Sequence, residues 1–337
     1  MTHVPRKRGH VMLRVSAMTA NNSSPAFLDA SRPDTPDLVV PQGVVPFYLD
    51  HRPVRGRLVR PGVLTDTLLT RHDNPDAVLR LAGEALALVA ALASSLKFRG
   101  SFSLQAKGDG PVSLLLADCT DSGALRFHAR SDDEQVAELL KTTPAPTASQ
   151  LLGKGYIAFS VDQGPDTDIH QGIVEMNGES LSEMAAHYFA TSEQHACWVR
   201  LFCEKTPVGW RSGALVMEKI AMDGGIDADM TPEEGDDAWE TAVTLATTLT
   251  AREVLDDTLS SADLLYRLFH AEGLVAGQPR ALAFGCRCSR ARLSGILETF
   301  PLDDLDHMAQ DGTITMNCSF CNHSFHFQRD EIGGKAA

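Results

Sequence analysis

Short runs of apolar residues recur through the first two thirds of the chain, and their spacing is typical of β-strands. Phe98, Phe102 and Leu104 all occupy even positions, as on one face of a strand, and residues 107–111 then break the chain with the sequence Lys-Gly-Asp-Gly-Pro. A second apolar run follows at residues 112–117, so this segment predicts a β-hairpin. We expect further strands at residues 44–49, 54–59, 125–129, 156–161, 172–175, 197–203 and 214–220.

Two helices interrupt this pattern of strands. Asn74 followed by Pro75 is a helix start signal, because proline suits the first helical turn, and the apolar run after it extends to about Leu96. A second helix is expected at about residues 180–192. Helices combined with mostly antiparallel strands predict that residues 39–221 form one N-terminal domain of the α+β class, built on a mixed α/β sheet.

From residue 222 the pattern changes to helices that follow an acidic segment. Thr231 and Glu234 form a capping box with Pro232 at the first helical position, so a helix should start there. This helix carries an apolar stripe at three- and four-residue steps, made of Trp239, Ala242, Val243, Ala246 and Leu249. Because its β-branched threonine and valine residues lower intrinsic helicity, we expect this helix to depend on docking against another surface.

A second helix of this region begins at Ser260, which forms a capping pair with Asp263, and it ends at Gly273. Its apolar positions are Leu264, Leu265, Leu268 and Phe269. Residues 222–277 are therefore predicted to form a helical linker. A small C-terminal domain is expected at residues 278–332.

Composition and charge narrow the class of protein. Apolar residues make up 43% and charged residues 22% of the 337 residues, as in ordinary globular proteins, and this length favours more than one domain. The formal charge of -14 opposes non-specific binding of nucleic acid. The most apolar stretch, residues 85–93, is far shorter than the roughly 20 residues that cross a bilayer, so no membrane crossing is predicted.

The first 38 residues are rich in serine, proline, asparagine and aspartate and show no apolar period, which predicts a disordered leader at residues 1–38. Its basic residues are not followed by the apolar core of a secretion signal, so we expect a cytoplasmic protein. A weak organellar presequence is the alternative interpretation of this basic, acid-poor segment.

Seven cysteines in a chain without an export signal favour a metal or redox role over a framework of structural disulfides. Four of them form two close pairs near the C-terminus, Cys286 with Cys288 and Cys318 with Cys321. Two pairs about thirty residues apart are the usual way in which a chain delivers four thiolates to one tetrahedral zinc ion. We therefore predict a zinc site in about the last fifty residues.

The nearby histidines and the other cysteines are weaker candidates for metal ligands than the four paired cysteines. His323 and His326 follow the second pair and could replace a cysteine, since imidazole also binds zinc, but surface or strand positions are favoured. Cys119, Cys197 and Cys203 lie in apolar strand contexts, and we interpret them as buried thiols without an assigned function.

Three properties favour a redox switch over a purely structural zinc site. A disulfide across the Cys-x-Cys pair would close a short, strained ring, and strained disulfides are the labile, regulatory ones. Zinc also holds the sulfurs as thiolates, which are the form that oxidants attack. Finally, structural zinc contributes about 10–16 kcal/mol to small modules, as much as the net stability of a domain, so loss of the metal should unfold the module.

Several segments between about residue 39 and the end of the chain carry a resemblance to a known family. They are Leu96-Lys97-Phe98, Lys107-Gly108-Asp109-Gly110-Pro111, Gly153-Lys154-Gly155-Tyr156, Tyr188-Phe189, Ser192-Glu193-Gln194, residues 264–270 and the two cysteine pairs. With these segments the chain resembles the redox-regulated holdase chaperones of bacteria, the heat shock protein 33 family or 33-kilodalton chaperonins.

The resemblance implies an N-terminal α+β domain, a metastable helical linker and a C-terminal domain that binds one zinc ion per chain. The zinc ligands in the reduced, inactive state would be Cys286, Cys288, Cys318 and Cys321. In this family, peroxide with mild unfolding stress, or hypochlorous acid, oxidises neighbouring cysteines, here Cys286 with Cys288 and Cys318 with Cys321. Zinc leaves, the linker unfolds, and the chaperone binds unfolding client proteins without ATP.

The same resemblance favours a homodimer in the oxidised state. Combined with the apolar stripe of the linker, it predicts client binding at Trp239, Val243 and Leu249, which would become exposed when the linker loses its support. Nucleic acid and membranes are not expected partners. The long leader and the three further cysteines depart from the family pattern without touching the proposed switch.

The main alternative is a zinc-ribbon adaptor protein with a purely structural metal, which predicts a basic, aromatic face near the zinc. The C-terminal domain instead mixes basic and acidic residues: Arg287, Arg290, Arg292, Asp303, Asp304 and Asp306. A thiol-disulfide oxidoreductase would place Cys318 and Cys321 at a helix start, whereas residues 314–316 and 325–327 predict the strands of a zinc hairpin. Because no Gly-x-Ser-x-Gly or His-Glu-x-x-His motif occurs, an enzyme is not expected.

Overall fold

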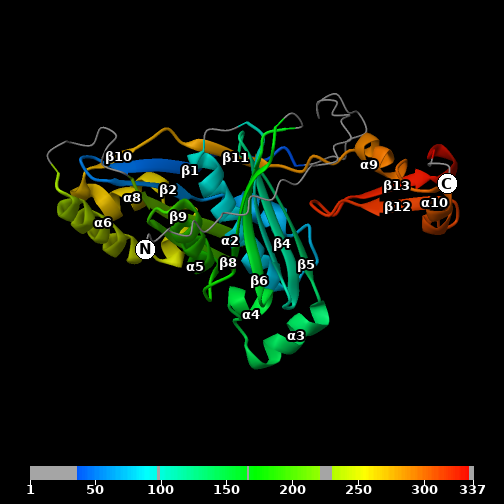
Figure 1. Ribbon diagram of the computed structural model, residues 1–337, viewed down its shortest axis with the longest axis horizontal. Helices are drawn as coiled ribbons and strands as arrows, with labels where there is room; N and C mark the ends of the chain where they lie inside the picture. The colour runs from blue at the N-terminus through cyan, green and yellow to red at the C-terminus, as the bar shows by residue number, and fades with distance from the viewer. Residues whose placement is uncertain (1–35, 97–98, 165–166, 221–229, 334–337) are drawn as a thin grey trace, which may run out of the picture.

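One large β-sheet runs through most of the molecule in the computed structural model, which describes residues 36–96, 99–164, 167–220 and 230–333 (Figure 1). Its strands are β1 (Val39–Leu49), β2 (Val54–Val59), β3 (Ser101–Gly108), β4 (Val112–Thr120), β5 (Ala124–Ser131), β6 (Gly155–Asp162), β7 (His170–Glu175), β8 (Cys197–Thr206), β9 (Gly209–Lys219), β10 (Leu274–Ala276) and β11 (Arg280–Phe284). The order across the sheet is β7-β6-β3-β4-β5-β11-β1-β2-β9-β8, and β10 pairs with β1.

The observed strands confirm the mixed α+β fold expected from the sequence. β3 and β4 pair as an antiparallel hairpin across the Gly-Asp-Gly-Pro break, as predicted, although Phe98 lies outside the described residues. The other pairs are also antiparallel except one, since β11 lies parallel to β5. β9 begins at Gly209, five residues before the expected start, because its first five residues include only one apolar side chain, Trp210, yet pair with β8.

The core of the sheet packs on one long helix, α2 (Asp76–Ser95), with Pro75 at its N-cap rather than in its first turn. α1 (Val63–Leu69) and α5 (Leu181–Tyr188) lie beside it, and a π-helical turn, Phe189–Glu193, completes the helix expected at about residues 180–192. α2 is long and apolar enough to cross a membrane. However, 78% of its apolar 18-residue stretch is buried inside the fold, as in a core helix. Gly83 permits this packing, because a Cβ there would lie 2.3 Å from the Sγ atom of Cys203.

The linker helices cover the opposite face of the sheet. They are α6 (Pro232–Thr247), α7 (Ala251–Val254) and α8 (Ser261–Phe269), and they lie along β1, β2 and β9 in Figure 1. Alternate residues of the same strands serve the two faces: Val44 and Val216 join the α2 core, whereas Val45 and Leu215 pack with the linker helices. The linker is therefore docked through one side of a shared sheet.

The predicted features of α6 are confirmed. Thr231 and Glu234 form the capping box, and the small stripe residues Ala242 and Ala246 are fully buried against the sheet. Leu249, just beyond the helix, is buried too, whereas Trp239 and Val243 are half-buried at the edge of this cluster. α8 begins just after Ser260, and the hydroxyl of Ser260 accepts a hydrogen bond from the amide N–H of Asp263, as expected.

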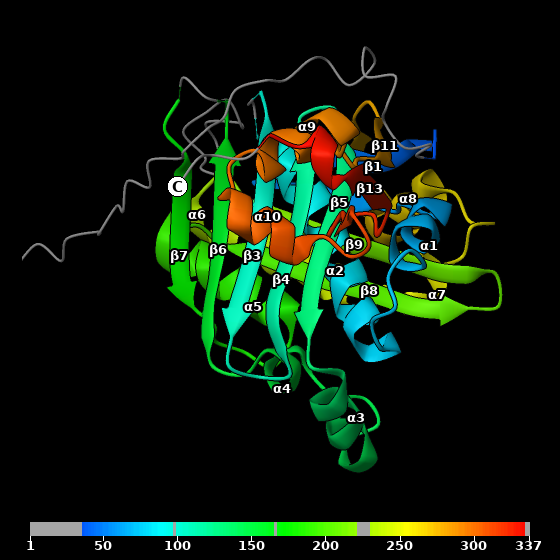
Figure 2. The ribbon, with the colours of Figure 1, turned by 90° about the vertical axis from the view of Figure 1, so that its right-hand side faces the viewer.

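The remaining elements form two peripheral groups. α3 (Asp133–Thr142) and α4 (Ala148–Leu152) connect β5 to β6. α9 (Arg290–Leu297), α10 (Leu302–Met308) and the hairpin of β12 (Thr313–Asn317) and β13 (Ser324–Gln328) make a C-terminal module. This module projects from the β5 side of the large sheet, with one end of its hairpin directed at the sheet (Figure 1), and it lies in front of the sheet in Figure 2.

The division into domains stays a prediction. The expected leader falls mostly on residues 1–35, and these, like Lys97 and Phe98 of the family motif, lie outside the described residues. β11 lies inside the expected C-terminal domain by number, yet it pairs with β1 and β5 of the large sheet. The C-terminal module is thus continuous with a central strand of the main sheet.

Glu84 on α2 is a half-buried carboxyl whose charge should weaken the fold at neutral pH. Burial raises the pKa of Glu84 from 4.5 to about 7, so the folded protein holds a proton that the unfolded chain has already lost between these values. Stability should therefore fall as pH rises from about 4.5 to about 7, by up to about 3 kcal/mol. We expect the Glu84→Gln variant to escape this loss.

Urea unfolding at pH 5 and pH 8 checks this expectation. The free energy of unfolding of Glu84→Gln should exceed that of the wild type by a larger margin at pH 8 than at pH 5. Glu134→Gln, at an exposed position of α3, is the control and should show no such difference. An equal margin for Glu84→Gln at both pH values would contradict the expected titration.

Candidate metal centre

Four cysteine sulfurs meet at the junction between the C-terminal module and the large sheet. The Sγ atoms of Cys286, Cys288, Cys318 and Cys321 all lie within 4.8 Å of one another, and all four residues are buried. Three of the separations are 3.4 Å for Cys286 to Cys288, 3.6 Å for Cys286 to Cys318 and 3.5 Å for Cys288 to Cys321. The structure therefore brings together the four cysteines that the sequence pairs.

Each pair is positioned by the end of a strand. Only Gly285 separates Cys286 from β11, so the first pair is held by the large sheet. Cys318 and Cys321 lie in the β12–β13 turn, where the amide N–H groups of Cys321 and Asn322 donate to the carbonyl of Cys318 at 3.3 and 2.8 Å. Asn322 has φ of 56°, a left-handed conformation that asparagine tolerates better than most residues. This tight turn aims both sulfurs inward.

The spacing of the sulfurs suits a tetrahedral metal ion. Sulfur ligands at about 2.3 Å from a central zinc ion would lie about 3.8 Å apart, close to the observed separations. Hydrogen bonding with Cys288 lowers the pKa of Cys286 to about 7, and hydrogen bonding with Cys286 lowers the pKa of Cys318. The same shared bonds raise the pKa values of Cys288 and Cys321. The four thiols thus titrate as one coupled group, and a metal ion requires them as thiolates.

The histidines next to the second pair are not part of this cluster. His323 is exposed and packs edge-on against the ring of Phe325, with 4.7 Å between ring centroids. The Nδ1 atom of His326 lies 3.1 Å from the hydroxyl of Thr315 across the hairpin, on its exposed face. The interpretation of both as surface or strand histidines is confirmed.

The position of the Cys-x-x-Cys pair also bears on the alternative functions. It lies in a hairpin turn and not at a helix start, which disfavours a thioredoxin-like oxidoreductase. The arginines that could serve a basic adaptor face are partly engaged within the protein. Arg287 pairs with Asp118, and Arg290 pairs with Glu331 at 3.0 Å while its guanidinium covers the ring of Phe327.

The remaining cysteines are separate from the cluster, and none of the seven, all of which are described, is joined by a disulfide. Cys119 and Cys203 are buried, and Cys197 is half-buried. Burial raises the pKa values of Cys119 and Cys197 to about 12 and raises that of Cys203 as well. These thiols stay protonated at neutral pH and are poor nucleophiles, as the sequence interpretation expects.

Sequence reasoning missed a set of contacts between the cysteine loops and the large sheet. Arg287, between the first two cysteines, pairs with the buried Asp118 of β4. The carbonyls of Ser319 and Phe320, between the last two, lie within hydrogen-bond reach of His128 Nδ1 at 3.1 Å and His72 Nε2 at 3.3 Å. Burial lowers the pKa values of both histidines, so each neutral ring has one N–H to donate. No spacing in the sequence links these positions.

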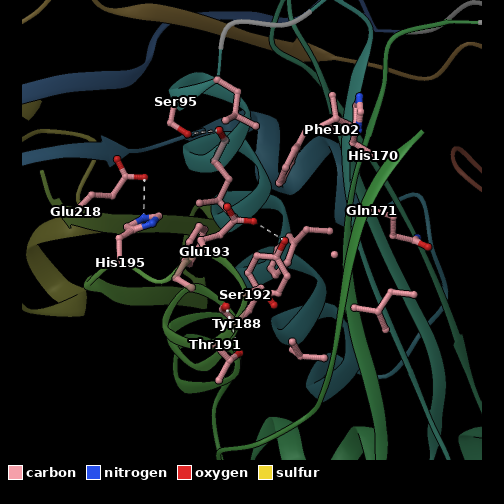
Figure 3. A pocket seen from close by; sticks show the side chains of 18 of the residues that line it. Ser95, Phe102, His170, Gln171, Tyr188, Thr191, Ser192, Glu193, His195 and Glu218 are labelled. Carbon is pink, nitrogen blue, oxygen red and sulfur yellow. Dashed lines mark hydrogen bonds and ion pairs between the residues drawn. The ribbon is translucent and has the colours of Figure 1, made fainter. Parts of the chain in front are cut away.

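A cavity of about 780 Å³ elsewhere in the fold is lined by residues from three of the family motifs (Figure 3). The hydroxyl of Tyr188 donates to Glu193 at 3.0 Å beside an aromatic cluster that includes Phe159. Glu218 also lines the cavity. Burial would raise its pKa, but the paired Arg57 and Arg55 hold that pKa below its usual value. These interactions explain the motif residues as packing and charge pairing, and we assign the cavity no function.

Comparisons with known proteins agree with this architecture. The family model described as Hsp33 protein matches residues 42–328. The 33 kDa chaperonin of Caulobacter vibrioides is 39% identical over 296 residues, which cover 86% of this chain and 96% of that protein. The 33 kDa chaperonin of Pseudomonas fluorescens is 32% identical over 288 residues, with 85% and 90% covered.

A solved structure shows the same fold. The crystal structure of the 33 kDa chaperonin (heat shock protein 33 homolog) of Thermotoga maritima covers 86% of this chain and 96% of its own, with a TM-score of 0.69 and 18% sequence identity. The match of the family model over most of the chain, together with relatives above 30% identity, decides the family. The chain belongs to the Hsp33 protein family.

Proposed function

We propose that this protein is a redox-regulated, ATP-independent chaperone that holds unfolding proteins, and that its four-cysteine cluster binds zinc and acts as the switch. The observation that carries the proposal is the gathering of four sulfurs within 4.8 Å in a chain of the Hsp33 family. The names of the relatives, 33 kDa chaperonins, support the chaperone class. No catalytic step is part of the proposed activity.

The proposed resting state is reduced, with one zinc ion per chain on Cys286, Cys288, Cys318 and Cys321. Zinc is favoured because a closed set of four thiolates is a common structural zinc site. Bound zinc would hold all four sulfurs as thiolates while keeping them from joining one another. The protein supplies the preformed spacing and the buried surroundings of the sulfurs.

Activation is proposed to be oxidation of the two neighbouring pairs. Each pair of thiolates gives up two electrons and forms one sulfur–sulfur bond, while one hydrogen peroxide takes up those electrons with two protons and becomes two waters. The sulfur separations allow more than one pairing, so the choice of Cys286 with Cys288 and Cys318 with Cys321 rests on the family resemblance. Disulfides are weaker metal ligands than thiolates, so oxidation should release the metal.

The linker is proposed to carry the signal to client binding. Its docked face is built from small side chains such as Ala242 and Ala246, and its stripe meets the sheet through the cluster around Leu249. When the C-terminal module unfolds, we expect this docking to fail and to expose Trp239, Val243 and Leu249 along with the sheet face beneath them. Clients would be unfolding proteins with exposed apolar segments. A homodimer of the oxidised form and a cytoplasmic location complete the proposal.

The first prediction of the proposed function concerns zinc binding and chaperone activity together. The reduced protein should contain one zinc per chain and should not suppress the aggregation of heated citrate synthase. Peroxide at mildly elevated temperature should release zinc and bring out suppression, and dithiothreitol with zinc should reverse both changes. Cys318→Ser should bind zinc more weakly, whereas Cys197→Ser is the matched control with normal zinc content. Zinc that stays bound through oxidation, with no suppression of aggregation, would rule out the switch.

The second prediction concerns thiol reactivity. After zinc is removed by a chelator under reducing conditions, N-ethylmaleimide should label the four clustered cysteines much faster than Cys119 and Cys203, whose burial keeps them protonated. Peptide mass spectrometry measures the labelling at each site and identifies the disulfides after peroxide. Fast labelling of Cys119 or Cys203 in the folded protein, or a disulfide that contains either, would contradict the assigned roles.

The third prediction concerns the linker. Ala246→Glu places a charge at a fully buried position between α6 and the sheet, so it should undock the linker while the metal site is intact. We expect partial suppression of citrate synthase aggregation without any oxidant, with zinc still bound. Thr247→Glu, on the exposed side of the same helix, is the control. If Ala246→Glu undocks the linker by circular dichroism and proteolysis yet stays inactive, the linker does not mask the client surface.

A further inference from the structure

Both loops that carry the cysteine pairs touch the large sheet through the residues that separate the cysteines. Arg287 stands between Cys286 and Cys288, and its guanidinium pairs with Asp118 of β4. Ser319 and Phe320 stand between Cys318 and Cys321, and their carbonyls face His128 and His72. The groups that form this contact therefore belong to the two cysteine loops, residues 286–288 and 318–321, which we call the metal loops.

One carboxylate and one guanidinium connect the two loops. Asp118 accepts hydrogen bonds from Arg126 of β5 at 3.2 and 3.4 Å, in addition to its pairing with Arg287. The same Arg126 guanidinium lies over the ring of Phe320, 4.1 Å from its centroid. The chain of contacts thus runs from Arg287 through Asp118 and Arg126 to Phe320, and it links the first cysteine pair to the second through the sheet.

The Asp118 carboxylate at the centre of this contact network is shielded from water, whereas Arg287 is partly exposed. The side chains of Asp118, Arg126 and Arg287 are 8%, 16% and 36% exposed. Removing the Arg287 side chain from the docked arrangement would leave the buried Asp118 carboxylate with one cationic partner fewer, which is costly. The register of β4 and β5 puts Asp118 directly opposite Arg126, which fixes the sheet side of the contact before the module docks.

The contact is also sensitive to the state of the sulfurs. Cys286 and Cys288 have their sulfurs 3.4 Å apart, and a disulfide would bring them to about 2.05 Å and turn the peptide that carries Arg287. Loss of a metal that holds both loops would likewise free Phe320 from its fixed position over Arg126. The β12–β13 turn, which carries Cys318 and Cys321, is the end of the module directed at the sheet in Figure 1. A change at these sulfurs therefore acts on the interface directly.

We propose that Asp118 and Arg126 are positioning residues that latch the two metal loops onto β4 and β5, so that metal binding and docking of the C-terminal module stabilise each other. Docking would hold the loops in the spacing that binds the metal, and loss of the metal would release the module and uncover the outer face of these strands. Because coupling between two sites is reciprocal, docking must raise the affinity for the metal by the same factor by which the bound metal favours docking. The inference rests on the zinc site of the proposed function and adds a route to the sheet that does not pass through the linker helices.

The test compares the zinc affinity of latch variants of the full-length, reduced protein. Arg287→Gln and Phe320→Ser each remove one loop's anchor without touching a cysteine, and Arg292→Gln, at an exposed position of the same module, is the control. Equilibrium competition with a chromophoric chelator should give a zinc affinity about fivefold or more weaker in both latch variants, with one zinc per chain bound at the start. The control should lose zinc at the same chelator concentration as the wild type.

A second readout separates a latch from a general loss of stability. Diethyl pyrocarbonate labelling, mapped by mass spectrometry, should increase at His72 and His128 when zinc is removed from the wild type. In Arg287→Gln and Phe320→Ser it should be high with zinc present, while His51 in the β1–β2 turn is labelled equally throughout. Wild-type zinc affinity in both latch variants, or labelling of these histidines that ignores zinc in the wild type, would overturn the latch.

These outcomes differ from a failure of the proposed function. If the wild type binds zinc and is activated by oxidation while both latch variants behave like Arg292→Gln, the latch is wrong and the switch stands. If the wild type binds no zinc, the zinc site itself is wrong, and the latch falls with it.

Discussion

The arrangement of this molecule depends on four thiol groups being held within a few ångströms of one another. Cys286 and Cys288 extend from a strand in the middle of the large sheet, while Cys318 and Cys321 come from a separate hairpin. Four sulfurs at this spacing, with shared protons or a metal ion, tie the hairpin to the sheet. Small modules of this kind bury little apolar surface, so such a centre supplies much of their stability.

The linker is held to the sheet without any metal ligand. Besides apolar packing, Arg60 donates to the carbonyls of Val254 and Leu259. Arg211 pairs with Asp257. Its helices bury small and aliphatic side chains on one face of the sheet, and the other face of the same strands belongs to the core around α2. The proposed function requires this docked layer to have a lower local stability than the core it covers. With a metal-dependent module at one side, the molecule would then change its exposed apolar surface without unfolding its core.

Much of this architecture was predictable because it depends on neighbours in sequence. The capping box of Thr231 and Glu234, the turn at residues 107–111 and the paired cysteines each act over a few residues, and the structure contains all three. The position of β11 between β1 and β5 was not predictable, because sheet order depends on partners far apart in the chain. The pairing of Asp118 with Arg287, 169 residues later, is hidden for the same reason. The start of β9, residues 209–213, has only a weak strand pattern in the sequence, yet it pairs with β8. Pairing with a neighbouring strand can therefore outweigh a weak local pattern.

Hydrogen–deuterium exchange of α6, residues 232–247, tests the central claim most directly, because it reports whether the linker answers to the state of the cysteines. The account predicts that its amides are protected in the reduced, zinc-loaded protein and exchange rapidly after peroxide treatment, while the amides of α2 stay protected in both states. Protection of α6 that is unchanged by oxidation and zinc release would contradict it, because the linker would then be an ordinary part of the fold and not the element that the cysteines control.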